Sequence, residues 1–210
     1  MLSDSGLGDV PEWVWRLGRL EMLDLAHNAL RAVPDGLAAL RRLEVLYLGG
    51  NALAEVPGAV RSLRALRYLG LAGNAIAFLP GWIGELDALV ELRLQDNRIG
   101  RVPDGIGGLG ALRALHLRAN RLERLPDEIG ALRELRHLDV RDNGLRTLPA
   151  ALAALPRLRV LDLRSNRIAS LPDELAGAPA LEKLDLRWND LRALPPAAMR
   201  LQDRGCFVLW

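Results

Sequence analysis

Apolar positions recur along the chain in a unit of constant length. Each unit follows the frame L-x-x-L-x-L-x-x-N-x-L-x-x-L-P, and the fourth one contains Leu92, Leu94 and Asn97. The L-x-L alternation has a period of two, which predicts a short strand with its apolar side chains on one face. The unit returns every 23 residues without insertion or deletion, so we expect stacked copies of one structure. The repeated asparagines are Asn28, Asn51, Asn74, Asn97, Asn120, Asn143, Asn166 and Asn189.

The asparagine of each unit lies where the chain must turn away from the strand. Its amide has two donors and one acceptor, so it can bond backbone groups that the bend leaves unpaired, and we expect these side chains to stack as a ladder. Nine of the twelve prolines share the same period and predict a turn of helix on the return path. Apolar pairs such as Leu37 and Leu40 follow and are expected to face inward, where stacked neighbours bury them together.

This unit resembles that of the leucine-rich repeat proteins, and the resemblance covers nearly the whole chain. The 23-residue form with L-P is similar to the cytosolic Ras-group and bacterial intracellular members. The resemblance implies an α/β solenoid with a curved parallel sheet on its concave face and short helical or 3-10 turns on its convex face. We expect one solenoid over 1–210, with a degenerate first repeat at 1–19, eight full repeats at 20–195 and a terminal cap strand at 196–210.

The two ends of the chain depart from the repeat. Trp13 and Trp15 follow the degenerate first copy, where we expect them to cover the end of the core. After the last proline of the repeat, Phe207 and Leu209 take the register of the strand leucines, which predicts a final strand with these two side chains as a plug. Cys206 has no acid–base partner close in sequence and is interpreted as a small buried residue.

Composition and charge narrow the classes of protein. Leucine supplies 47 of the 210 residues, and 28 basic residues balance 26 acidic ones. A balanced charge argues against a dedicated nucleic-acid binder and a polybasic membrane anchor. A single cysteine and an amino terminus without the pattern of a signal peptide favour a cytoplasmic protein. The many alanines and arginines beside a single lysine, Lys183, resemble a GC-rich bacterial source.

Variable positions between the strand leucines point out from the concave sheet, so they are the candidate contacts for a partner. In repeats one to three, tyrosines lie among small residues at 49, 50, 70, 72 and 73, which predicts an apolar depression with hydroxyl groups at its rim. The alternative is that the small residues merely fill space. Trp188 is either a second anchor or part of the packing of the cap. The candidate partner-binding residues are Met22, Val45, Tyr47, Arg67, Tyr68, Arg93, His116 and Trp188.

Repeats five to eight carry charge instead, in a motif L-D-x-R. We expect the aspartates and arginines to form an exposed, self-paired ladder that keeps the surface soluble. The alternative is an arginine-rich strip for an acidic partner, to which Arg113, Arg136 and Arg159 would add. The pairs of the motif are Asp139 with Arg141, Asp162 with Arg164, and Asp185 with Arg187.

One group of side chains has the chemistry of a metal site. His116 and Asp139 are expected to face each other on adjacent strands, with His137 two residues away. Two histidines and a carboxylate can bind a metal, but solvent-facing positions without supporting partners make the interpretation weak. We therefore predict no catalytic residue, metal or cofactor.

Three functions remain open. The first is a non-enzymatic scaffold that binds a protein or peptide on its concave face as a monomer; the Ras-group resemblance implies a partner in a small-GTPase pathway as one option. The second is the substrate-recognition module of a bacterial effector or ligase whose enzyme lies elsewhere. The third is a structural protein that self-associates through the strand edge at residues 207–210. No nucleic acid or membrane partner is expected.

Overall fold

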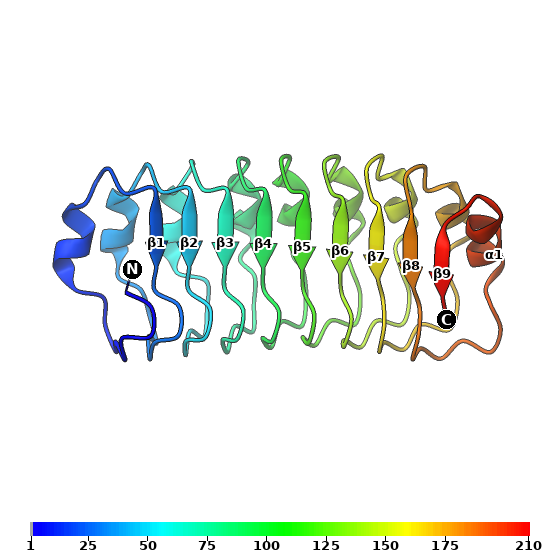
Figure 1. The fold of residues 1–210 in the computed structure, drawn as a ribbon, viewed down its shortest axis with the longest axis horizontal. Coiled ribbons are helices and arrows are strands. Elements are labelled where there is room, and N and C mark those ends of the chain that lie inside the picture. Colours follow the sequence, from blue (N-terminus) through cyan, green and yellow to red (C-terminus); the bar gives the residue numbers. More distant parts are fainter. Residues whose placement is uncertain (1) are drawn as a thin grey trace.

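The computed structural model describes residues 2–210, and within them one parallel sheet of nine strands runs the length of the molecule (Figure 1). The strands lie side by side in sequence order, and each residue of one strand pairs with the residue 23 positions later in the next up to β8. The strands are β1 (Met22–Asp24), β2 (Val45–Tyr47), β3 (Tyr68–Gly70), β4 (Glu91–Arg93), β5 (Ala114–His116), β6 (His137–Asp139), β7 (Val160–Asp162), β8 (Lys183–Asp185) and β9 (Phe207–Leu209).

A second layer of short helices lies behind the sheet (Figure 1). Each helix directly follows one of the nine periodic prolines, whose fixed φ and missing N–H suit the first turn of a helix. The segments are η1 (Glu12–Arg16), η2 (Asp35–Ala39), η3 (Gly58–Ser62), η4 (Gly81–Glu85), η5 (Asp104–Gly108), η6 (Asp127–Ala131), η7 (Ala150–Ala154), η8 (Asp173–Gly177) and α1 (Pro196–Asp203). The first eight are 3-10 helices, and α1 is an α-helix.

One continuous core fills the space between the two layers. The strand leucines such as Leu46 and Leu69 are fully buried, and so are the convex pairs such as Leu37 with Leu40. Because neighbouring units present the same apolar cross-section, leucine recurs where an irregular core would need side chains of different shapes. The expected solenoid, with its strands on the concave face, is confirmed.

The asparagine ladder is present and holds successive repeats together. Asn97 shows the pattern: its Oδ1 accepts the backbone N–H of Ile76 at 3.0 Å, and its Nδ2 donates to the carbonyls of Leu71 and Leu94 at 2.9 and 3.0 Å. Each asparagine therefore bonds its own turn and the turn of the preceding repeat. The expected use of all three hydrogen-bonding groups of the amide is confirmed.

A second periodic feature, which the sequence analysis missed, is the residue directly before each asparagine. This position has a left-handed φ between 52° and 65° in every repeat, whether it holds His27, Gly50, Asp96 or Trp188. Glycine and aspartate tolerate this conformation better than most residues. Their recurrence here was the signal available in the sequence.

The carboxy-terminal strand differs from the prediction by one residue. Val208, not Phe207 or Leu209, pairs with the core residue Leu184 and is buried, whereas Phe207 is 60% exposed. The expected plug of Phe207 and Leu209 is therefore wrong. The eight-residue helix α1 replaces the five-residue 3-10 helix of other repeats, and the interval between inward positions grows from 23 residues to 24.

Of the two tryptophans expected to cover the amino-terminal end of the core, only Trp15 packs against it. Val14 of η1 is buried, Trp15 packs against the core, and Trp13 stays largely exposed. Cys206 is buried as expected, and burial raises the pKa of its thiol. A thiol of raised pKa holds less thiolate at neutral pH, so it is a poor nucleophile.

Candidate interaction surface

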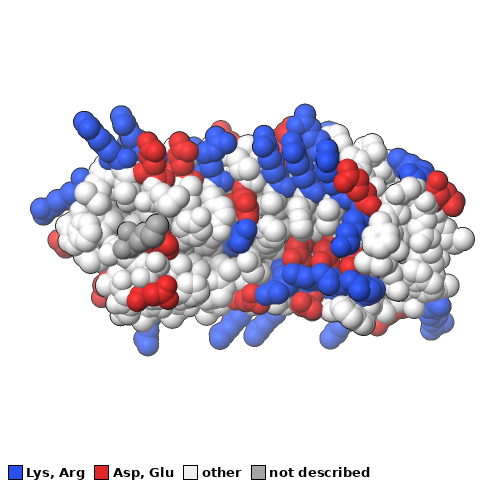
Figure 2. Space-filling model, viewed as in Figure 1, with Lys and Arg blue, Asp and Glu red and all other residues white. Residues whose placement is uncertain are grey.

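The concave face of the sheet is divided into two unlike halves. The half over β1 to β4 is mostly uncharged, and charged side chains gather over β5 to β8 (Figure 2). Outward side chains on neighbouring strands are in register, as shown by the pairs Val45 with Tyr68 and His116 with Asp139. Side chains of equivalent positions therefore form rows about 4.8 Å apart.

The two tyrosines lie together in the uncharged half. The ring centroids of Tyr47 and Tyr68 are 4.8 Å apart, and the Arg93 guanidinium lies 5.6 Å from the centroid of Tyr68. Val45 pairs with Tyr68 across the strands, and Met22, which pairs with Val45 on the other side, is exposed. We call Met22, Val45, Tyr47, Tyr68 and Arg93 the aromatic patch.

The small residues beside the tyrosines do not form the expected depression. A Cβ atom on Gly70 would lie 3.1 Å from the ring of Tyr68 and 3.6 Å from that of Tyr47, so the two rings cover this glycine. Gly50 and Gly73 occupy the left-handed turn position, where the backbone itself favours glycine. The two rings therefore fill the space over Gly70 and do not leave it open.

Polar contacts hold the edge of the aromatic patch. Glu91 accepts a hydrogen bond from Nε of Arg93 at 2.6 Å and lies 3.7 Å from Nε2 of His116. Partial burial raises the pKa of the Tyr68 phenol. Burial, together with the neighbouring His137, lowers the pKa of His116.

The other two candidates differ in position. Arg67 is exposed directly before β3, next to Tyr68 of the patch, and has no ion pair within residues 2–210. Trp188 lies beyond β8, well apart from the patch, and is 68% exposed with the Arg187 guanidinium 5.3 Å from its ring centroid. This exposure contradicts the alternative that Trp188 packs into the cap.

Asp139 and Asp185 of the charged half are buried and Asp162 is partly buried, which corrects the expectation of an exposed ladder. The side chain of Asp185 is 2% exposed while that of its partner Arg187 is 38% exposed, with 2.7 Å between Oδ2 and Nη2. Arg164 bonds Asp162 through Nη2 at 2.6 Å and lies 3.4 Å from Asp185 of the next strand. The self-pairing is confirmed, but the arginines cover the carboxylates.

The pKa values of Asp139 and Asp162 are shifted in opposite directions. Burial outweighs the contacts with Arg141 at Asp139 and raises its pKa. At Asp162 desolvation is the largest single effect, but the hydrogen bonds and charge of Arg164, together with the charge of Arg141, outweigh it and lower the pKa. Asp139 and Asp162 thus occupy equivalent positions on neighbouring strands, but their pKa values are shifted in opposite directions.

The three possible metal ligands, His116, His137 and Asp139, contact other side chains. The rings of His116 and His137 are tilted against each other with centroids 5.2 Å apart, and Asp139 faces Arg141 at 3.3 Å. Within residues 2–210, no group of three metal-ligating side chains is arranged to bind an ion.

The repeat identified in the sequence and structure matches a known family. The family model for the leucine rich repeat matches residues 2–53, 18–76, 87–145 and 133–191. The chain belongs to the leucine-rich repeat family. A comparison with curated proteins finds no match to the sequence.

Several solved structures resemble this leucine-rich repeat chain. The leucine-rich repeat domain of the type III effector XopL is 29% identical with a TM-score of 0.87, over 99% of this chain and 74% of that domain. A leucine-rich repeat protein of Leptospira interrogans is 30% identical with a TM-score of 0.76, over 97% of this chain and 58% of the other. The plant peptide hormone receptor RGFR1, solved in complex with RGF2, is 29% identical with a TM-score of 0.77, over 87% of this chain and 30% of the receptor chain.

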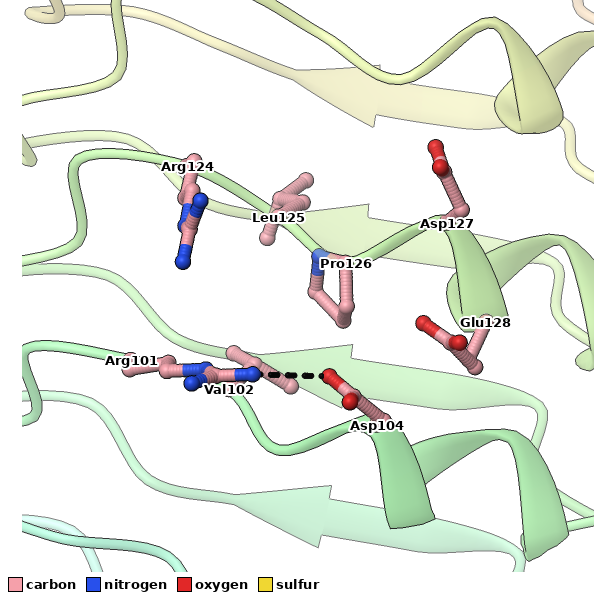
Figure 3. A pocket seen from close by; sticks show the side chains of 8 residues that line it. All are labelled: Arg101, Val102, Asp104, Arg124, Leu125, Pro126, Asp127 and Glu128. Carbon is pink, nitrogen blue, oxygen red and sulfur yellow. Dashed lines mark hydrogen bonds and ion pairs between the residues drawn. The ribbon is translucent and has the colours of Figure 1, made fainter.

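A hollow of about 220 Å³ lies outside the concave face of this leucine-rich repeat protein, between the loops that lead into η5 and η6 (Figure 3). Two of the charged side chains that line it pair with each other, because Arg101 donates a hydrogen bond to Asp104 at 3.0 Å. No helix in residues 2–210 has both the length and the apolar character needed to cross a bilayer.

Proposed function

We propose that this leucine-rich repeat chain is a non-enzymatic interaction module that binds a protein or peptide on its concave face. The observation that carries the proposal is the aromatic patch. Tyr47 and Tyr68 lie against each other with Arg93 beside them, on a face that no other part of residues 2–210 covers. Tyrosine and arginine are the side chains that most often dominate the binding energy of protein interfaces.

The comparisons support this class of function. The RGFR1 structure is a complex of a plant peptide hormone receptor with RGF2, and it aligns with 87% of this chain. The second candidate, a recognition module of an effector or ligase whose enzyme lies elsewhere, is favoured by the similarity to the repeat domain of the effector XopL. Both candidates place the contact on the repeats, so one experiment tests what they share.

The test is affinity capture from a lysate of the source organism, followed by mass spectrometry. The variant Tyr47→Ala/Tyr68→Ala removes the patch, and Phe78→Ala is its matched control. Phe78 is 79% exposed in the loop between β3 and η4, outside the concave face. We expect the same partner on wild type and Phe78→Ala, and its loss from the double variant. A partner retained equally by all three proteins would contradict the proposal.

A further inference from the structure

Two rows of arginines run across the charged half of the concave face. The leading row lies directly before β5, β6 and β7, and the trailing row lies two residues beyond the ends of β5 to β8. Figure 2 shows basic side chains above and below a strip of other residues over these strands. The leading row is Arg113, Arg136 and Arg159, and the trailing row is Arg118, Arg141, Arg164 and Arg187.

The trailing row is held in place from beneath. Nε and Nη2 of Arg187 both donate to the carboxylate of Asp185, at 3.0 and 2.7 Å, and Arg164 binds Asp162 through the same two nitrogens. Within the described part of the chain, Nη1 of neither arginine has a hydrogen-bond partner. Because the carboxylates are buried and the guanidiniums lie over them, free N–H donors remain for a ligand.

The leading row has almost no carboxylates of its own. Arg113 and Arg136 are exposed and form no ion pair within residues 2–210, and Arg159 lies 3.5 Å from Glu182, with both side chains more than half exposed. Like charges on adjacent strands, about 4.8 Å apart, repel each other. An anion bound along this row relieves that repulsion, whereas the trailing row is already neutralised by its aspartates.

We infer that the two rows bind an acidic, extended segment of a protein partner that lies between them along the axis of the solenoid. Successive side chains of an extended segment point to opposite sides, so alternate acidic residues reach the leading and the trailing row. The rows lie roughly 16 Å apart along the strands, at about 3.3 Å per residue. Arginine and glutamate side chains approaching from opposite sides close this gap. The inference rests on the proposed function and adds the chemistry of the partner.

The surface favours an acidic protein over a nucleic acid. Single-stranded nucleic acids gain much of their affinity by stacking bases on aromatic side chains. The strip between the rows offers the rings of His116 and His137, which lie against each other, and one exposed tryptophan, Trp188, lies at the end of the trailing row. The buried aspartates add negative charge beneath the trailing row, and the whole chain carries a formal charge of only +2. Separate carboxylates that meet individual guanidiniums suit this surface better than a continuous phosphate backbone.

The test measures binding of a fluorescein-labelled oligoglutamate peptide by anisotropy at low salt, with an oligoglutamine peptide and an oligouridine RNA as competing probes. The variant Arg113→Glu/Arg136→Glu reverses the unpaired charges of the leading row. Its matched control is Arg124→Glu/Arg146→Glu, which changes the net charge equally in neighbouring repeats through exposed residues in the loops after β5 and β6. Arg113→Gln/Arg136→Gln serves as the milder variant if charge reversal impairs folding.

We expect the oligoglutamate peptide to bind wild type and the control alike. Its Kd should rise about ten-fold or more in Arg113→Glu/Arg136→Glu and by a smaller factor in the glutamine variant. Equal affinity in all variants, or tighter binding of the RNA than of the peptide, would overturn the inference. Tyr47→Ala/Tyr68→Ala should retain peptide binding, so failure of the aromatic patch as a partner site and failure of the arginine rows are separate results.

Discussion

Replacement of one ladder asparagine by alanine tests how the repeats are held together. In Asn97→Ala, the N–H of Ile76 loses its acceptor. The carbonyls of Leu71 and Leu94 each lose one of two donors, and they keep the Nδ2 of Asn74 and of Asn120, respectively. The carbonyl of Gln95, a fourth and longer contact, keeps a backbone N–H from the preceding repeat. Asn97 is buried, so the N–H of Ile76 is left without a partner or water, at a cost of about 1–3 kcal/mol, and two carbonyls lose their second hydrogen bond. We expect a loss of about 2 kcal/mol in the free energy of unfolding.

Urea denaturation followed by far-UV circular dichroism measures this loss. Arg98→Ala is the neighbouring control, and as an exposed substitution it should change the free energy of unfolding by no more than about 0.5 kcal/mol. Asn28→Ala should cost less than Asn97→Ala, because Asn28 is only partly buried and water can replace its bonds. A loss below about 1 kcal/mol for Asn97→Ala would refute the reasoning.

Three further predictions follow from single positions. Trp188→Gly should leave the free energy of unfolding unchanged or raise it by up to about 1 kcal/mol, because Trp188 has a left-handed φ of 59° that glycine adopts more easily. A lower melting temperature in this variant would contradict the prediction. Val208→Asp should lower the melting temperature strongly and Phe207→Asp should barely change it, whereas the reverse order would restore the register predicted from the sequence. In pH-dependent urea unfolding, Asp139→Asn should gain stability over wild type as pH rises through the raised pKa of Asp139. Asp162→Asn should lose stability at neutral pH and recover as pH falls; equal pH profiles would contradict both.

Most of the fold was predictable because every repeat meets the same physical demand. Leu46 and Leu69 occupy one inward position, and the structure buries both in the same way. The prediction failed where the period ends: α1 adds one residue, and Val208 takes the inward position assigned to its neighbours. Periodicity predicts register only as long as the connection between strands keeps its length.

The sequence predicted which residues of the candidate surface lie next to one another, but not how exposed each side chain is. The parallel register places Tyr47 near Tyr68 and Asp139 beside Asp162, as the sequence implied. That the rings cover Gly70 and that arginines cover Asp185 depends on side-chain rotamers, which neighbours on both strands select. A row assigned as outward-facing can therefore hold a nearly inaccessible carboxylate.

The backbone conformation of the repeat helps to interpret Trp188, which lies at the left-handed position before the last ladder asparagine. The left-handed position before each asparagine accepts Gly50 and Gly73, so the turn requires no side chain there. At the equivalent position Trp188 adopts a conformation that a bulky residue disfavours, and it contributes little to the core because it is mostly exposed. Its ring lies 5.3 Å from the guanidinium of Arg187, the last arginine of the trailing row. A residue that stabilises neither the turn nor the core, next to the end of a charged row, supports its assignment as a contact for the partner that lies along that row.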